Sequence, residues 1–349
     1  MSDAAPRDAA EPDDASTGAG ATAGDATGRG DALDGQAAAR AAAARDAAAR
    51  DAAEEASAFS HPPVEPDATA AYGAHPDQVI DFYAPRGTEP GEAPDQAPLV
   101  VVLHGGAWRS AYDRRHITPF ADFLARRGFA VANVEYRRGA LIPSQTDGSS
   151  APDAGAGGAT GAVAGRWPDT LDDVAAAFDA LPALVREALP QADPRRMVIT
   201  GHSAGGHLAL WAAARHVLPS GSPWRTDRPA PLRGVVALAP IADFHAAEKL
   251  DVCGGAVTQF LGGQAQFAER RPHVDPALLL PTGIATTLVQ GRADVVVPHV
   301  VAEAYADAAA KAGEVVGFTL LEDVGHFPLI DPAADACAVV AEEIAQLAW

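Results

Sequence analysis

The chain has 349 residues, with 46 acidic and 26 basic side chains and therefore a formal net charge of −20. An acidic chain with only two lysines is a poor ligand for nucleic acids, because that affinity depends on Lys and Arg that neutralise phosphates. No apolar run approaches the ~20 residues of a membrane span. The two Cys, Cys253 and Cys337, indicate neither a disulfide framework nor a zinc site. The first residues lack the basic start and apolar stretch of a secretory signal, so we expect a cytoplasmic protein with reduced thiols.

Residues 1–60 are predicted to form a disordered acidic arm. They contain 24 Ala and only three larger apolar side chains, so they cannot bury enough apolar area to offset the entropy lost on ordering. Residues 36–56 have a high intrinsic helix propensity. Because they lack a stripe of large apolar side chains, we expect a helix there to remain solvated and loosely attached.

From about residue 76, short apolar runs alternate with longer amphipathic runs. Apolar strands separated by helices predict an α/β fold, with a mostly parallel sheet covered by helices on both faces. We expect this fold to occupy residues 76–349 as one domain. The predicted strands cover residues 78–84, 98–104, 129–136, 196–200, 234–239, 285–290 and 317–322. The predicted helices cover residues 117–127, 169–188, 204–217, 298–312 and 333–347.

Residues 144–165 interrupt this alternation with a stretch rich in Gly, Ser and Ala. A segment of this length without predicted elements indicates a flexible insertion. It lacks the Lys-Ser/Thr of a phosphate-binding loop and no strand leads into it, so we expect no nucleotide site there. Trp167 and Asp169 are interpreted as the boundary between this loop and the next helix.

The strongest chemical signal is Gly-His-Ser-Ala-Gly-Gly at residues 201–206. It follows a predicted strand and precedes an apolar helix, which is the setting in which G-x-S-x-G forms a nucleophile elbow. The sharp turn projects Ser203 at the carboxyl edge of the sheet, and the glycines remove side chains that would obstruct it. A helix N-terminus with free N–H groups also favours developing negative charge. The alternative is a glycine-rich turn with a purely structural role.

A serine hydroxyl is a weak nucleophile that needs a base. His326 directly follows the last predicted strand, so it should lie at the same sheet edge as Ser203. Asp294 follows another strand and lies between the two in the chain, which is the Ser, acid, His order of this motif. It would fix the imidazole tautomer and stabilise the imidazolium. The rival acids are Asp243, which would cap the next segment, and Glu322 and Asp323, which are better interpreted as loop structure.

Acyl transfer also needs donors for the oxyanion of the tetrahedral intermediate. Gly105 and Gly106 follow the predicted strand at 98–104 and let backbone N–H groups approach a substrate oxygen. With the N–H of Ala204 they would form an oxyanion hole. Trp108 is predicted to line the acyl pocket, with packing as its alternative role.

Four further side chains receive structural interpretations. His104 is expected to brace the glycine loop. His202 and His207 flank the serine without the spacing of a metal motif, so we interpret them as structural or pocket-lining residues. Cys253 is interpreted as a free thiol with no catalytic role.

The motifs HGGAW at 104–108, NVEYRR at 133–138, GHSAGGHLAL at 201–210, GRADVVVP at 291–298 and GHF at 325–327 together resemble the α/β-hydrolase superfamily. More narrowly, they are similar to its serine esterase branch, which includes kynurenine formamidase-like and feruloyl esterase-like proteins.

This resemblance covers about residues 76–349 and implies an α/β-hydrolase fold. It implies Ser203 as nucleophile, Asp294 as acid and His326 as base. Gly105, Gly106 and Ala204 match the family's oxyanion positions. The segment at about 240–283, with Phe260 and Leu261, corresponds to the family's variable cap-like region, whereas the 144–165 insertion departs from the pattern.

The resulting hypothesis is a serine hydrolase that cleaves a carboxylic ester through an acyl-enzyme, without a metal or an organic cofactor. Its partner is a small-molecule ester or amide, and the sequence assigns no oligomeric state. One alternative is an aryl formamidase that cleaves N-formylkynurenine through the same residues. Another is a non-catalytic binding protein with the hydrolase fold.

Overall fold

The structure, a computed structural model, describes residues 25–87, 96–139 and 164–349. The predicted insertion at 144–165 lies outside these ranges except for its last two residues, and residues 1–24 of the predicted arm lie outside them as well. No helix in the described ranges is long and apolar enough to cross a lipid bilayer.

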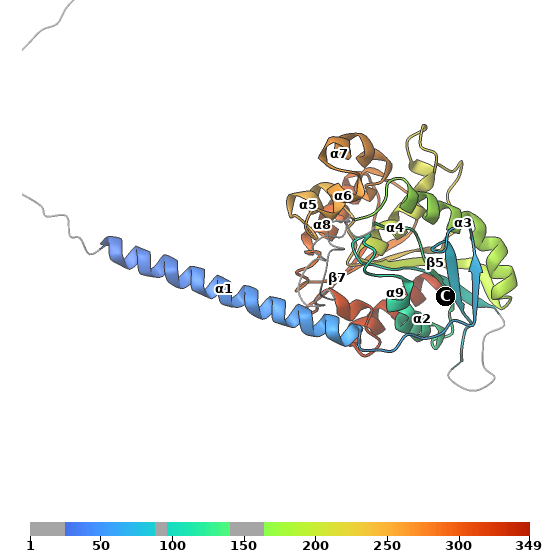
Figure 1. Ribbon diagram of the computed structural model, residues 1–349, viewed down its shortest axis with the longest axis horizontal. Helices are drawn as coiled ribbons and strands as arrows, with labels where there is room; N and C mark the ends of the chain where they lie inside the picture. Colours follow the sequence, from blue (N-terminus) through green and yellow to red (C-terminus); the bar gives the residue numbers. More distant parts are fainter. Residues whose placement is uncertain (1–24, 88–95, 140–163) are drawn as a thin grey trace, which may run out of the picture. The chain divides into compact units, whose positions relative to one another are not determined.

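A sheet forms the centre of the fold, with helices around it (Figure 1). It has eight strands among the described residues, in the order β1-β2-β4-β3-β5-β6-β7-β8. Strands β1 and β2 are antiparallel to their neighbours, and all the other pairs are parallel. The strands are β1 Ala68–Ala71, β2 Val79–Tyr83, β3 Ala97–Leu103, β4 Ala130–Val134, β5 Ala192–His202, β6 Gly234–Leu238, β7 Thr286–Gly291 and β8 Gly317–Leu321. The predicted α/β fold with a mostly parallel sheet is therefore confirmed.

All seven predicted strands are present. Strands β3, β4 and β6 are buried along their whole length, which explains why the sequence shows them as continuous apolar runs. The strand that the sequence did not predict, β1, consists of Ala-Thr-Ala-Ala, whose small side chains give little strand signal.

Helices pack on both faces of the sheet, and alternate strand residues point to opposite layers. Val101 of β3 belongs to a core cluster with residues of α3, α4 and α8, whereas Val102 belongs to a second cluster with residues of α2 and α9. The α-helices after α1 are α2 Thr118–Ala125, α3 Asp169–Ala188, α4 Ala204–Ala213, α5 Phe244–Lys249, α6 Ala256–Phe260, α7 Gln264–Arg270, α8 Val300–Lys311 and α9 Asp335–Ala348. The 3-10 helices are η1 Arg114–Ile117, η3 Arg215–Val217, η4 Arg271–His273, η5 Pro276–Leu278 and η6 Phe327–Leu329.

The five predicted helices are present. The predicted boundary at Trp167 and Asp169 is also confirmed, because α3 begins at Asp169. The segment at 240–283 contains three short helices, α5, α6 and α7, which the sequence did not predict. They are five to seven residues long, so they offer less than two turns of periodic pattern.

The arm prediction needs a correction. Residues Asp25–Ala58 form one helix, α1, and the chain divides into two compact units at Asp46 and Ala47. The last three turns of α1 therefore belong to the same unit as the sheet. Their inner face is partly or fully buried, and Ala58 is only 4% exposed. The composition of the arm did not predict this attachment because it depends on a few polar contacts and on the single ring of Phe59, described below, and not on a stripe of large apolar side chains.

Helix α9 gives a direct test of the second core layer. Val340 is fully buried there, so Val340→Ala should lower the free energy of unfolding by about 2–3 kcal/mol, from lost apolar burial and the cavity left behind. Val315, which is 93% exposed, undergoes the same chemical change at the surface, so Val315→Ala should change this free energy by less than about 0.5 kcal/mol. Urea unfolding measures both. Equal effects of the two substitutions would contradict the layer assignment.

Candidate active site

Ser203 occupies the turn between β5 and α4. Its backbone has φ 58° and ψ −117°, a conformation that non-glycine residues rarely adopt. The turn is held by the neighbouring strand β6, because Ser203 N–H donates to the carbonyl of Leu238 at 2.8 Å. Ser203 O in turn accepts from the N–H of Ile241 at 3.3 Å. This is the strand–turn–helix geometry that the sequence predicted for a nucleophile elbow.

Three glycines make this turn possible because the backbone approaches itself too closely for a Cβ. A Cβ on Gly205 would lie 2.0 Å from Leu103 O, and one on Gly201 would lie 2.3 Å from Gly205 O. On Gly206 it would lie 2.9 Å from the side chain of Pro240. These glycines therefore let the start of α4 pack against the ends of β3 and β5.

His326 and Asp294 form a buried hydrogen-bonded pair. His326 Nδ1 lies 2.7 Å from Asp294 Oδ2, and the two residues are 2% and 5% exposed. Since a carboxylate only accepts, Nδ1 carries the proton in the neutral ring and Nε2 remains free to act as a base. The pair lies at the carboxyl ends of adjacent strands, with Asp294 after β7 and His326 after β8.

The carboxylate of Asp294 is oriented by all of its neighbours. Oδ1 accepts the N–H groups of Val296 and Val297 at 2.9 and 2.8 Å. Oδ2 accepts from the side-chain amide of Gln290 at 3.1 Å as well as from His326. The role of Gln290 was not visible in the sequence, since an amide inside an apolar strand has no motif.

His202 holds the loop after β8 next to Ser203. This loop carries His326 and is called the histidine loop below. The rings of His202 and His326 lie 4.3 Å apart, and His202 Nε2–H donates to the carbonyl of His326 at 3.0 Å. Burial lowers the pKa of His202 well below its usual range, and the proximity of His326 acts in the same direction, so His202 is neutral. It is 3% exposed and supports the loop, which favours the structural interpretation over the pocket-lining one.

Among the described residues, no hydrogen bond joins Ser203 Oγ to His326 Nε2. Such contacts are often long in free enzymes and tighten when substrate binds. The structure therefore places the three residues at one edge of the sheet, and none of the residues it describes hydrogen-bonds the serine hydroxyl.

The glycine loop after β3 lies directly beside Ser203. A Cβ on Gly105 would lie 3.3 Å from Ser203 Cβ, and the next three residues, Gly106, Ala107 and Trp108, all have positive φ. Among the described residues, no hydrogen bond uses the backbone N–H of Gly105, Gly106 or Ala204. Gly105 and Ala204 thus lie beside Ser203, and their N–H groups have no partner among the described residues.

His104 braces this loop, as expected. Its Nε2 lies 2.9 Å from Glu135 Oε1, its ring stacks on Tyr136 at 4.3 Å, and Tyr136 Oη–H donates to its carbonyl at 2.7 Å. Burial acts to raise the pKa of Glu135, but His104 and Arg138 outweigh it and lower this pKa to about 2. Glu135 was not predicted as a site residue, although its position directly after β4, at the same sheet edge, was a usable signal.

The prediction that Trp108 lines an acyl pocket is corrected. Its side chain is fully buried, stacks on Phe260 at 4.6 Å and contacts the ring of His207 at 5.2 Å. It therefore packs inside an aromatic cluster, which was the alternative interpretation. Leu261 is fully buried next to this cluster.

The rival acids have other partners. Asp243 caps α5 by accepting the N–H of Ala246 at 2.8 Å, as expected. Glu322 accepts from Arg292 Nε at 2.7 Å on the surface, and Asp323 occupies a loop position with φ 57°. Cys253 and Cys337 are both free thiols. Burial raises the pKa of Cys253 to about 11, which opposes formation of a nucleophilic thiolate.

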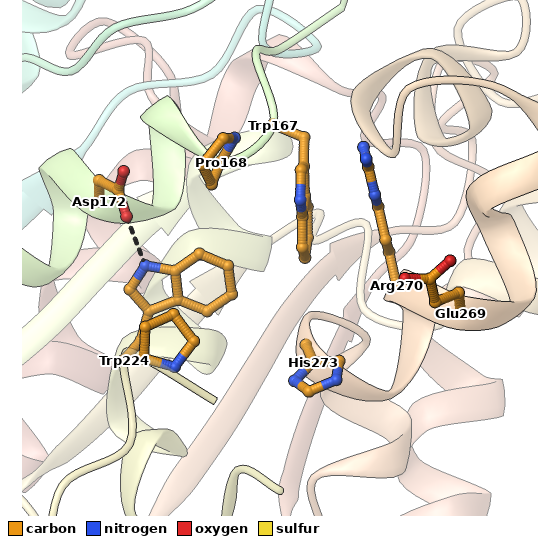
Figure 2. A pocket seen from close by; sticks show the side chains of 8 residues that line it. Trp167, Pro168, Asp172, Trp224, Glu269, Arg270 and His273 are labelled. Carbon is orange, nitrogen blue, oxygen red and sulfur yellow. Dashed lines mark hydrogen bonds between the residues drawn. The ribbon is translucent and has the colours of Figure 1, made fainter. Parts of the chain in front are cut away.

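A cavity of about 370 Å³ lies elsewhere and is lined by none of these residues. Figure 2 shows the indole of Trp224 pointing at Asp172, to which its Nε1–H donates at 2.7 Å. The guanidinium of Arg270 lies 5.0 Å from the centre of the Trp167 ring. Because these groups are already engaged with one another, we assign the cavity no part in the chemistry. Its lining residues are Trp167, Pro168, Asp172, Pro223, Trp224, Glu269, Arg270 and His273.

The family of the chain follows from a match to the alpha/beta hydrolase family over residues 100–339. This match covers more than half of the chain, so the chain belongs to the alpha/beta hydrolase family.

Two sequence relatives match shorter stretches. The probable carboxylic ester hydrolase LipM of Mycobacterium tuberculosis is 28% identical over 148 residues, 42% of this chain and 28% of LipM. The non-reducing polyketide synthase atr1 of Stereocaulon alpinum is 28% identical over 136 residues, 39% of this chain and 5% of the synthase. The chain therefore spans less than a third of the length of either relative.

Solved structures share the fold. Esterase B of Lactobacillus rhamnosis aligns with a TM-score of 0.61 and 19% identity, over 88% of this chain and 95% of its own. A truncated carbohydrate esterase from gut microbiota gives 0.59 and 19%, over 82% and 99%. The propionate-bound thermophilic esterase of Thermogutta terrifontis gives 0.55 and 19%, over 80% and 92%.

The buried ring of His207 predicts a pH dependence of stability. Burial lowers its pKa to about 3, against 6.5 for the free side chain, although its Nε2–H donates to Val274 O at 2.9 Å. As pH falls below 6.5, protons bind the unfolded chain first, so this residue weakens the folded state. Between pH 7.5 and 5, the wild type should lose about 2 kcal/mol more free energy of unfolding than His207→Phe, as measured in urea. His245, exposed on α5, is the control, and His245→Phe should follow the wild type. Parallel pH curves for all three proteins would contradict the prediction.

Proposed function

We propose that the chain is a serine hydrolase that cleaves a carboxylic ester through Ser203, His326 and Asp294. The observation that carries the proposal is the 2.7 Å hydrogen bond from His326 to Asp294, on a histidine whose ring packs against the residue before Ser203. A strained serine at a helix N-terminus, a buried imidazole with its Nε2 free and a fixed carboxylate are the parts that nucleophilic acyl transfer needs.

The reaction follows from these positions. Ser203 Oγ attacks the ester carbonyl while His326 Nε2 takes the hydroxyl proton, and Asp294 stabilises the imidazolium that forms. The N–H groups of Gly105, Gly106 and Ala204 hold the oxyanion. When the intermediate collapses, the C–O bond to the alcohol breaks and His326 returns the proton to the leaving oxygen. A water molecule then attacks the acyl-Ser203 ester with His326 as base, which releases the carboxylic acid and restores the serine.

The ester as substrate class is supported by the names of the relatives, since LipM is called a probable carboxylic ester hydrolase and the three aligned structures are called esterases. The same residues would also cleave the formamide bond of N-formylkynurenine, the alternative raised by the sequence. That substrate therefore belongs in the same assay.

Ser203→Ala should lower kcat/KM for p-nitrophenyl acetate and butyrate by about 10⁴-fold or more, because the nucleophile is lost while the fold is kept. It should also abolish covalent labelling by a fluorophosphonate probe. The control is Ser220→Ala, an identical change at an exposed serine, which should leave both readouts unchanged.

Full ester hydrolysis by Ser203→Ala would refute the proposed nucleophile. A wild type that neither takes up the probe nor hydrolyses any ester would favour the non-catalytic binding protein. Hydrolysis of N-formylkynurenine with a far higher kcat/KM than the p-nitrophenyl esters would reassign the substrate and keep the mechanism.

A further inference from the structure

The last three turns of α1 present carboxylates to the domain and not to solvent. Ala47, Asp51, Glu54 and Ala58 are partly or fully buried, whereas most residues between them are exposed. Their spacing of four, three and four residues puts them on one face of the helix. Burying carboxylates costs free energy unless they are paired or hydrogen-bonded, so the burial of Asp51 and Glu54 must be explained by what they contact.

Glu54 contacts the loop that carries His326. Its Oε1 accepts the backbone N–H of Gly325 at 3.2 Å, one residue before the histidine. A Cβ on Gly325 would lie 1.9 Å from Glu54 Oε2, so the glycine leaves room for this carboxylate. Burial raises the pKa of Glu54, and the hydrogen bond from Gly325 acts against that change.

Asp51 lies one turn before Glu54, on the same partly buried face of α1. Its carboxyl interacts electrostatically with His326 and Asp294: burial raises its pKa, His326 lowers it and Asp294 raises it. Its Oδ1 is buried and has no hydrogen-bond partner among the described residues. A buried carboxylate oxygen without a hydrogen bond costs free energy, which a nearby positive charge can offset.

The residues that follow Glu54 also contact the histidine loop and the segment directly after it. Ser57 Oγ–H donates to Asp331 Oδ2 at 2.6 Å, and His61 Nε2 lies 2.7 Å from Asp331 Oδ1. The ring of Phe59 packs against Phe327 at 5.5 Å.

The same helix end also reaches the glycine loop. Glu55 Oε1 accepts from Tyr112 Oη–H at 3.2 Å, and a Cβ on Gly106 would lie 2.6 Å from the side chain of Tyr112. Phe59 contacts this ring as well, at 5.9 Å. The end of α1 therefore touches both loops that would carry out the chemistry.

We propose that the end of α1 completes the active site, with Glu54 as a positioning residue for the histidine loop and Asp51 as a second negative charge near the imidazole. This inference rests on the proposed function. Glu54 fixes the peptide before His326 and hence the direction of Nε2 toward Ser203. Asp51 stabilises the imidazolium that forms when His326 accepts the serine proton.

The charges around His326 allow this role for Asp51 to be isolated. Asp294 accepts a hydrogen bond from Nδ1 and neutral His202 packs against the ring. On α1, Glu54 contacts the residue before His326, and Asp51 lies one turn before Glu54. Removing Asp51 alone therefore changes one negative charge and leaves the Asp294 hydrogen bond in place.

Asp51→Asn should move the acid limb of kcat/KM for p-nitrophenyl acetate to lower pH by about 0.5–1 unit, because the imidazolium loses an adjacent opposite charge. The acid limb of fluorophosphonate labelling, which reports the acylation half-reaction alone, should move equally. Asp46→Asn removes the same charge from an exposed position on α1 and should leave both limbs unchanged.

Glu54→Ala should lower kcat by about tenfold with KM unchanged, because a small misplacement of a catalytic base slows chemistry more than binding. Glu54→Gln keeps an oxygen that accepts the Gly325 N–H and should restore most of the activity. If Glu54→Ala fails to fold, the isosteric Glu54→Gln decides the role of Glu54: a kcat close to that of the wild type supports positioning through Gly325, and a tenfold loss overturns it.

The outcomes separate the two proposals. An active wild type whose acid limb is the same in Asp51→Asn and Asp46→Asn overturns the role of Asp51, and a Glu54→Gln variant as slow as Glu54→Ala overturns positioning through Gly325. A wild type that cleaves no ester and resists the probe overturns the proposed function, and this inference with it.

Discussion

The absence of a Cβ at residues 201, 205 and 206 is the constraint on which the site depends. Any side chain at Gly205 would collide with the carbonyl groups at the end of β3. That contact puts the glycine loop against Ser203, and it also sets where α4 starts. The strained turn at Ser203 and the position of Gly105 beside it are therefore products of one close approach between strands and helix.

The topology of the sheet places the other two residues of the candidate site, Asp294 and His326. Strands β7 and β8 are parallel neighbours, so the loops that follow them leave the sheet at the same edge as the loop after β5. A Cβ on Gly291 would lie 2.3 Å from Val324 O, which shows how closely these two loops run together. Two residues 32 positions apart in the chain thus form one buried pair.

Much of this arrangement could be predicted from the sequence because it rests on local patterns. Buried parallel strands are continuous apolar runs, and the serine motif combines a strand, a turn and a helix within a few residues. Asp294 and His326 followed from their positions after strands. What could not be predicted depends on contacts between distant residues. Glu135 lies 31 residues from the ring it holds, and Glu54 lies 271 residues from the amide it accepts.

The end of α1 shows why composition misled. A helix rich in Ala and acidic residues has no apolar stripe, so its pattern predicts a solvated arm. Its attachment to the domain instead relies on single hydrogen bonds to Gly325 and Asp331 and on the ring of Phe59. A single sequence has no periodic pattern that predicts such polar contacts. The buried valines of β3, by contrast, form a continuous apolar run that predicts a strand.

The family match covers residues 100–339, which is a shorter stretch than the compact unit that begins at Ala47. Strand β2 pairs with β4, so the sheet extends past the start of that match. The compact unit begins at Ala47, two turns before the first contact with the histidine loop. A protein trimmed to the boundaries of the match would expose one edge of β4 to solvent and to other chains. The useful boundary for expression is therefore set by where the contacts end, near Ala47, and not by where sequence similarity ends.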